Sequence, residues 1–265
     1  MPGHHSWQSR TSRVRGLTRA SLGLLPGLAL LAWWQWNASH DQAFRFFAGS
    51  PASVAARAAE LLATRATYID ILTTLAEASL GLAAGLLVGL ALALALWRSL
   101  TLASVLSPYL LLLGSIPIFG LAPLLVFWLG VGILSKATVA FLSTLFITIA
   151  QSLQGVRDVQ ADYLRLGRAL GASPRALIFK VLLPGSVSSL SAIARSAAGL
   201  ALIGAFVGEF ISAEQGLGHM ILRASATYDA STAMVGILLL ALVGYGLGRA
   251  TSAAISLAVT LVSKI

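Results

Sequence analysis

Long apolar runs dominate the chain, and the charged residues collect in the short stretches between them. About 20 apolar residues form a helix that crosses the hydrocarbon core of a bilayer. By this criterion the pattern predicts an all-α integral membrane protein with about six transmembrane helices. The expected spans are 17–36, 69–97, 102–131, 135–153, 187–211 and 232–262.

The first run ends in Trp33, Trp34 and Trp36, whose amphipathic rings suit a membrane interface. A signal peptide is the alternative, but the run is too long for one and no A-x-A-like site follows closely. We therefore expect a retained anchor at 17–36, preceded by a cytoplasmic tail at 1–16. The polar stretch 37–68 reads as an extracytoplasmic segment with a short amphipathic helix near 53–66, and 69–262 as a core of five spans.

The third run is interrupted by Gly114-Ser-Ile-Pro-Ile-Phe-Gly120. Broken helices at membrane depth usually line a cavity rather than face lipid. Ser115 and Pro117 are therefore candidates for the lining of a pathway. A packing kink is the alternative.

Composition agrees with a membrane protein. Of the 265 residues, 57% are hydrophobic and 10% are charged, and the mean hydropathy is +0.87. The chain has no cysteine, which excludes disulfides and thiolate chemistry. The net charge of +9 has no accompanying aromatic and basic face, so we expect no nucleic acid partner.

Lys and Arg gather on one side of the predicted spans, and cytoplasmic loops carry such an excess. Eleven lie on the side of the amino terminus and five on the other, which predicts cytoplasmic termini. The eleven are Arg10, Arg13, Arg15, Arg19, Arg98, Arg157, Arg165, Arg168, Arg175, Lys180 and Lys264; the five are Arg45, Arg57, Arg65, Lys136 and Arg223.

Small residues recur at intervals of four within two spans. Gly81, Gly85 and Gly89 share one helix face, and Gly244 and Gly248 share another. Such faces let helix backbones approach closely, so the pattern predicts helix packing rather than chemistry.

The charged stretch 157–184 predicts two short cytoplasmic helices joined at an angle. Val159, Tyr163, Leu166 and Leu170 form one apolar stripe, while Asp162 and Arg165 are close enough to pair. Gly171 is placed to end the first helix, and Ser173 with Pro174 begins the second, which we expect to stop at Pro184. From these patterns the two helices lie on lipid or dock on a cytoplasmic partner.

The segment 165–184 resembles the EAA loop of ABC importer permeases. That signature is E-A-A, three residues, Gly, nine residues, Ile or Val, one residue, Leu-Pro. Gly171, Val181, Leu183 and Pro184 match at the right spacing, whereas Arg165-Leu-Gly167 replaces Glu-Ala-Ala. Two further segments, Ser115 to Gly132 and Glu209 to Gly218, resemble the nitrate, sulfonate and taurine permease branch.

This resemblance implies a type I importer permease that works as a homodimer, with its pathway at the two-fold interface. It implies a cytoplasmic ATPase (two copies or a heteropair), a periplasmic or lipid-anchored solute-binding protein and a bacterial inner membrane. It also implies a small solute, with nitrate or a taurine-like sulfonate as the expected class and vitamin-precursor rings as another. The implied coupling residues are Asp162, Arg165, Gly167, Arg168, Gly171, Ala172, Ser173, Val181, Leu183 and Pro184.

Charges within the predicted spans are candidate functional residues because they are costly in lipid. Glu77, Arg195 and Arg249 are candidates for the pathway, with packing ion pairs as the alternative. Arg195 and Arg249 alone do not establish a cationic pathway. Glu209 is expected near an outer helix end, reaching water, and forms a candidate contact for the binding protein with Glu214, Gly216 and Gly218.

The sequence predicts no enzymatic activity. None of the three lysines, Lys136, Lys180 and Lys264, follows the glycine of a P-loop, so ATP and Mg²⁺ would belong to a partner. The histidines form no metal-like pair. A self-contained secondary transporter or channel, or a scaffold without transport activity, are the alternative classes. The first has no use for an EAA-like loop, and the second predicts that changing Gly171 or Pro184 alters stability only.

Overall fold

The computed structural model describes residues 25–97, 100–159, 161–212 and 214–262, and the regular elements within these ranges are all helices. The chain divides into two compact units. The first combines Met1–Ala63 with Ala224–Val235, and the second combines Thr64–Arg223 with Gly236–Ile265.

In the first unit residues 25–40 are helical, followed by α2 (Gln42–Ala48) and α3 (Pro51–Leu62). Asp41 caps α2 by accepting hydrogen bonds from the N–H groups of Ala43 and Phe44. Ser50 caps α3 in a reciprocal capping box with Ser53. The short helix predicted near 53–66 is therefore found, while residues 17–24 of the predicted first span lie outside the described residues.

A polar network joins α3 to residues 229–232. Arg57 Nε donates to Thr232 Oγ1 at 2.7 Å, and Arg57 Nη2 lies 3.6 Å from Asp229 Oδ2. Partial burial acts to raise the pKa of Asp229, but hydrogen bonds from Thr232 and the Arg57 charge outweigh it and lower the pKa below its usual value. The network therefore stabilises this unit while Asp229 is ionised.

The second unit is built from long apolar helices, the last of which, α12, begins at Ala230 in the first unit. Four helices in the described residues are long and apolar enough to span a membrane: α4 (Arg65–Trp97), α7 (Ile133–Asp158), the continuous helix Pro174–Ile211 and α12 (Ala230–Val262). α5 (Leu100–Gly114) and α6 (Ile118–Leu129) raise the number to five if they count as one bent span. These ranges agree with five of the six predicted spans.

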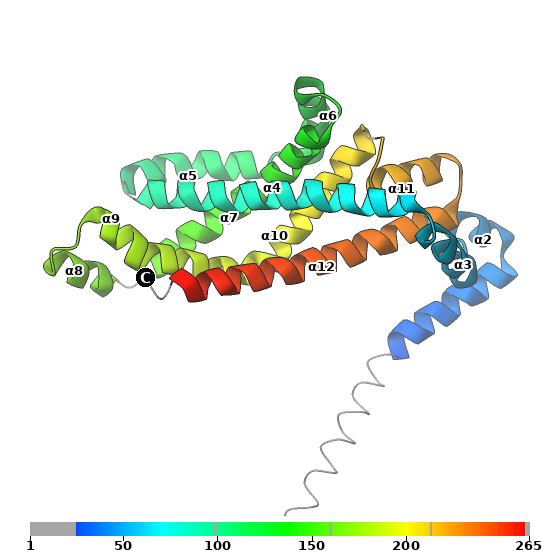
Figure 1. Ribbon diagram of the computed structural model, residues 1–265, viewed down its shortest axis with the longest axis horizontal. Coiled ribbons are helices and arrows are strands. Elements are labelled where there is room, and N and C mark those ends of the chain that lie inside the picture. Colours follow the sequence, from blue (N-terminus) through cyan, green and yellow to red (C-terminus); the bar gives the residue numbers. More distant parts are fainter. Residues whose placement is uncertain (1–24, 98–99, 160, 213, 263–265) are drawn as a thin grey trace, which may run out of the picture. The chain divides into compact units, whose positions relative to one another are not determined.

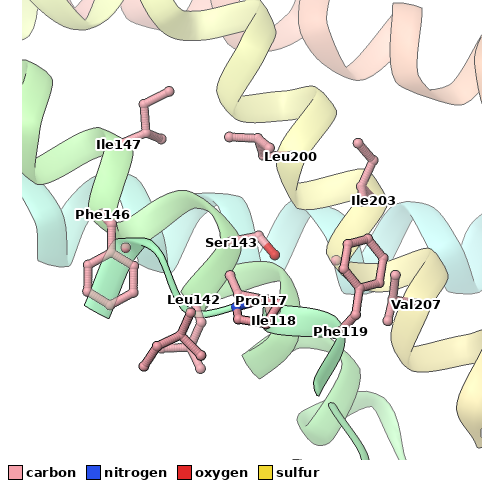
Figure 2. Close-up of a pocket in the computed structure, with 13 residues that line it drawn as sticks. Pro117, Ile118, Phe119, Leu142, Ser143, Phe146, Ile147, Leu200, Ile203 and Val207 are labelled. Atoms are coloured by element: carbon pink, nitrogen blue, oxygen red, sulfur yellow. The ribbon is translucent and has the colours of Figure 1, made fainter. Parts of the chain in front are cut away.

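The predicted interruption of the third span is present. The helix axis bends by 87° between α5 and α6. Pro117, which has no N–H to donate, stands at the start of α6 with φ of −66°. Figure 2 shows the break beside side chains of α7 and α10.

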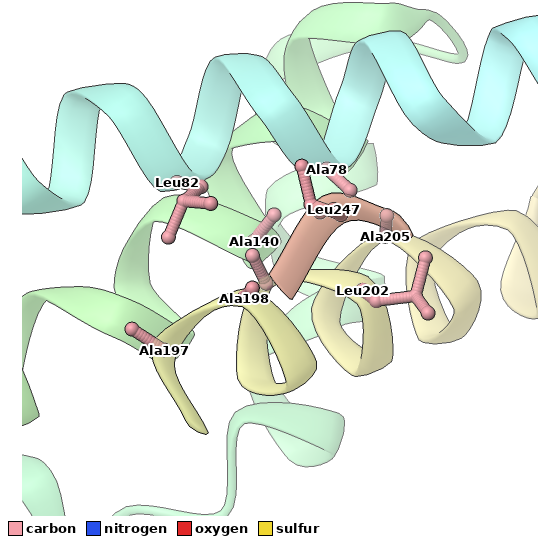
Figure 3. Close-up of a cluster of buried hydrophobic side chains, with 9 residues drawn as sticks. Ala78, Leu82, Ala140, Ala197, Ala198, Leu202, Ala205 and Leu247 are labelled. Carbon is pink, nitrogen blue, oxygen red and sulfur yellow. The ribbon is translucent and has the colours of Figure 1, made fainter. Parts of the chain in front are cut away.

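The glycine face of α4 packs against α7. A Cβ on Gly81 would lie 2.6 Å from the Ala137 carbonyl oxygen and 2.7 Å from the Phe141 nitrogen, and one on Gly89 would lie 2.7 Å from Thr148 Cγ2. Only glycine allows such an approach, so the predicted packing role is confirmed for this face. Figure 3 shows the neighbouring core, in which α10 contributes small alanines beside Leu202.

The smaller glycine face on α12 packs against α10. A Cβ on Gly244 would lie 2.8 Å from Leu202 Cδ2, and one on Gly248 would lie 3.7 Å from Arg195 Cα. Gly246 lies between these two glycines in the sequence, and a Cβ placed on it would meet no atom within 4 Å. The α10–α12 contact therefore uses the predicted pair.

Two elements differ from expectation. The helix that begins at Pro174 does not stop at Pro184: it passes through a π-helical turn, Ile178–Leu182, into α10 (Leu183–Ile211). A π-turn changes the local hydrogen-bond spacing, which lets the chain pass a residue that lacks an N–H. A further helix, α11 (Leu217–Ala226), is absent from the sequence-based expectation.

Candidate functional site

The charged loop predicted from the sequence forms a two-helix elbow at one end of the second unit (Figure 1). α8 (Ala161–Ala169) is followed by Gly171, whose φ of +78° lies in the left-handed region. The N–H groups of Gly171 and Ala172 donate to the carbonyls of Arg168 and Gly167, which is the Schellman arrangement. Ser173 then caps α9 (Pro174–Leu177) by accepting from the Ala176 N–H. The predicted Gly-centred turn and cap are thus confirmed.

Close packing fixes the angle of the elbow. A Cβ on Gly167 would lie 2.6 Å from Leu177 Cδ2, and Leu177 is buried. The absence of a side chain at Gly167 therefore lets α8 approach Leu177 of α9 closely. The predicted Asp162–Arg165 pair is not tested, because the Asp162 side chain lies outside the described residues.

The elbow exposes apolar and basic groups together. Tyr163, Leu166, Leu170 and Phe179 are all more than half exposed, with Leu170 at 78%. Arg165, Arg168, Arg175 and Lys180 are exposed on the same two helices and the π-turn. The apolar stripe Val159, Tyr163, Leu166 and Leu170 lines one side of a groove of about 540 Å³, and Lys180 and Val181 line the other.

A buried acid–base cluster lies between α4, α7 and α10. Its members are Thr74, Glu77, Lys136 and Glu209, each at most 5% exposed. Lys136 Nζ lies 3.8 Å from Glu77 Oε1, and Thr74 Oγ1 donates to Glu209 Oε1 at 2.6 Å. Glu77 Oε2 has no hydrogen-bond partner among the described residues. The cluster joins three spans that are far apart in sequence.

The same cluster holds the start of α11. The N–H groups of Gly216, Leu217 and Gly218 donate to Asp70 Oδ1 at 2.8 Å, Thr74 Oγ1 at 2.9 Å and Glu209 Oε2 at 2.6 Å. The first N–H groups of a helix have no partner within the helix, and carboxylates are favoured there. α11 is therefore capped by side chains of α4 and α10.

The predicted position of Glu209 at a water-accessible helix end is wrong. Its side chain is fully buried because it caps α11 instead of extending outward. Gly216 and Gly218 are also buried, and a Cβ at either position would meet the Glu209 carboxyl group. Of the candidate contacts for a binding protein, only Glu214 is exposed.

The cluster also changes the interpretation of two charged residues. Glu77 faces Lys136 inside the bundle. This arrangement agrees with the alternative in which Glu77 forms a packing ion pair, and not with a position in an open pathway. Lys136, expected among the loop charges, is 5% exposed in the first turn of α7. A signal was available: Lys136 lies within a run that is otherwise apolar from Phe119 to Ile149 apart from small and hydroxyl residues.

The break between α5 and α6 borders a cavity of about 350 Å³ (Figure 2). Pro117 and Phe119 line it, together with Ser143 and Phe146 of α7 and Ile203 of α10. The Ser143 hydroxyl donates its hydrogen bond to the Val139 carbonyl of the same helix, and not into the cavity. The lining is almost wholly apolar, and Ser115, although exposed, is not part of it.

Arg195 and Arg249 are brought together by the α10–α12 contact. Gly248 packs on the Arg195 backbone, and Arg249 is the next residue of α12. Both arginines are exposed, and no salt bridge to either is found among the described residues. The described residues also contain no group of three metal-ligating side chains.

Comparison with known proteins identifies the family. The model of the binding-protein-dependent transport system inner membrane component family matches residues 85–263, which include the elbow and three of the long spans. The chain belongs to this family. Its members are permease subunits of ABC transporters, which are not themselves enzymes.

Individual relatives agree with this assignment. A probable ABC transporter permease protein of Haemophilus influenzae is 36% identical over 63% of this chain and 68% of its own length. The formylaminopyrimidine transport permease protein of Halalkalibacterium halodurans is 32% identical over 67% of this chain and 71% of its own. The taurine transport system permease protein of Escherichia coli is 30% identical over 65% of this chain and 62% of its own. The permease is thus similar to proteins named for chemically different solutes.

Proposed function

We propose that this permease imports a small anionic solute and couples to a separate ATPase through the elbow 157–184. The ATPase, in two copies or as a heteropair, supplies the ATP and Mg²⁺ sites. The permease acts as a homodimer in the bacterial inner membrane, with its pathway at the two-fold interface. A periplasmic or lipid-anchored binding protein delivers the solute to the face opposite the elbow.

The observation that carries the coupling proposal is the surface of the elbow. An exposed apolar stripe beside a groove, held at a fixed angle by Gly167 and Gly171, is the kind of surface that a partner protein covers. The basic residues around it support a cytoplasmic location. Family membership supports a separate ATPase and a solute-binding protein as partners. The anionic class rests on the taurine permease relative and on Arg195 and Arg249.

Gly171→Arg tests the coupling surface, and Gly130→Arg is its matched control. Both glycines have φ near +80° with open space where a Cβ would stand, so both substitutions cause similar backbone strain. Gly171 lies on the elbow, whereas Gly130 lies in the loop before α7, at the other end of that span. Only the first substitution places a bulky cation on the proposed docking surface.

The measurement is affinity purification of the full-length chain from its native membrane in mild detergent, followed by mass spectrometry. We expect a P-loop ATPase with the wild type and with Gly130→Arg, and a loss of at least tenfold with Gly171→Arg. A folded wild-type chain that brings down no ATPase would refute the proposed function and favour a self-contained transporter or channel. Equal recovery of the ATPase from both variants would instead show that the elbow is not part of the interface with the ATPase.

A further inference from the structure

Arg195 lies near the middle of the membrane-spanning bundle. On α10 it stands between Ser189, which donates to the Gln151 carbonyl of α7, and Gly204, which packs on Ala140 and Ser143 of α7. These contacts bracket the middle of α7 (Ile133–Asp158). Because Gly248 packs on Arg195, Arg249 lies at a similar depth.

Among the described residues of the second unit, no acidic residue lies at this depth. Only nine Asp and Glu residues occur in the sequence. Glu77 and Glu209 are buried beside Lys136, and Glu209 is about 21 Å along α10 from Arg195 at 1.5 Å per residue. Asp158 ends α7, and the other six lie outside the spans or near the beginning of one.

A second copy does not supply the missing charge. In a two-fold dimer whose axis runs along the membrane normal, each residue keeps its own depth. The partner copy therefore brings its own two arginines to this level and no carboxylate. A charged side chain at mid-membrane is costly unless it faces a counter-charge or water. The two arginines therefore face water, and a counter-charge at this depth comes from outside the permease.

The face that carries Arg195 differs from a lipid-facing surface. Around Arg195 the exposed positions of α10 hold small and hydroxyl residues, Ser188, Ser191, Ala192 and Ser196. The large exposed side chains of this helix, Ile203, Phe210 and Ile211, lie eight or more residues further along. α4, by contrast, exposes Leu72, Leu80 and Leu87 at 55 to 70%. Large apolar groups suit lipid, whereas small polar groups beside a cation suit a water-filled passage.

We infer that Arg195 and Arg249 form a mid-membrane site that binds the anionic group of the transported solute. The inference rests on the proposed function and deepens it, because it names the recognition chemistry. The ligand class is a compact oxyanion such as a sulfonate, carboxylate or nitrate, which guanidinium groups bind through paired hydrogen bonds. The small residues Ser188, Ser191, Ala192 and Ser196 leave space on this part of α10 for such a solute beside Arg195.

Cysteine labelling tests this site without knowledge of the solute, since the natural chain has no cysteine. Ser191→Cys places a thiol one helical turn from Arg195 on the exposed stripe. The full-length chain is labelled in open membrane fragments with two membrane-impermeant methanethiosulfonates. One carries a sulfonate and the other a trimethylammonium group. Leu87→Cys is the control, because Gly85 and Gly89 on either side of it pack at the level of Thr144 and Thr148 near the middle of α7.

We expect Ser191→Cys to react with both reagents and Leu87→Cys with neither. Adding Arg195→Gln or Arg249→Gln should lower the ratio of sulfonate to trimethylammonium labelling rates about tenfold, because a cation concentrates anions near it. Arg195→Lys should retain most of the preference. Comparing ratios removes the intrinsic difference between the two reagents.

Two results would overturn the inference. One is a labelling ratio that does not change when either arginine is neutralised. The other is a Ser191→Cys thiol that reacts only after denaturation in detergent, which would place this face against lipid or headgroups. Recovery of the ATPase from the same membranes distinguishes the two proposals. If the ATPase is recovered but the labelling ratio is unchanged, only the anion site is rejected. If no ATPase is recovered, the proposed function is rejected.

Discussion

Replacing Lys136 with methionine should strongly destabilise the bundle. Methionine keeps the apolar stem but removes the only cation of the buried acid–base cluster. Lys136 Nζ lies 3.8 Å from Glu77 Oε1, and both side chains are almost fully buried. Removing one partner of a buried pair typically costs about 3–5 kcal/mol, because the other charge is left uncompensated.

The size of the effect can be measured as a shift in melting temperature of the detergent-solubilised protein. At about 2–4 °C per kcal/mol for a chain of this size, Lys136→Met should melt about 10 °C below the wild type. Arg65→Met, which removes an exposed cation at the start of α4, should shift it by no more than about 2 °C.

A double variant separates lost attraction from lost packing. In Lys136→Met combined with Glu77→Gln, the uncompensated carboxylate becomes a neutral amide of the same shape. We expect this variant to recover more than half of the lost melting temperature. The reasoning fails if Lys136→Met melts within about 3 °C of the wild type, or if the double variant is no more stable than the single one.

Two further predictions concern packing and pH. Gly81→Ala should lower the melting temperature by several degrees, because its Cβ would meet the α7 backbone at 2.6 Å, whereas Gly246→Ala, with open space beside it, should be neutral or slightly stabilising. Because hydrogen bonds from Thr232 and the Arg57 charge hold the pKa of Asp229 below its usual value, its contribution to stability is present above about pH 4 and is lost as the pH falls through that lowered pKa. In melting curves, Asp229→Asn should therefore be less stable than the wild type at neutral pH, and the difference should shrink as the pH falls below about 4 through the lowered pKa. A difference that stays constant from neutral pH into that acidic range would contradict the assignment.

The sequence alone was sufficient to predict the features that depend on neighbours along the chain. The lengths of the apolar runs placed five spans, and Pro117 with its flanking glycine marked the break in one of them. The elbow was equally local: Gly171 ends one helix and Ser173 begins the next by bonds that reach no more than five residues. Helical periodicity predicts that Gly81 and Gly89 share one face, but it does not predict that this face packs against α7.

Tertiary structure decided the features that depend on residues far apart in sequence. Lys136 looked like a loop charge because nothing near it in sequence reveals Glu77, which is 59 positions away but adjacent in space. α11 carried no local capping signal, because its caps come from α4 and α10. Pro184 predicted a helix end, yet a π-turn and packing across the bundle carry the helix past it. In each case a free-energy contribution from contacts between distant helices outweighed the local preference, and hydropathy along a single chain contains no record of those contacts.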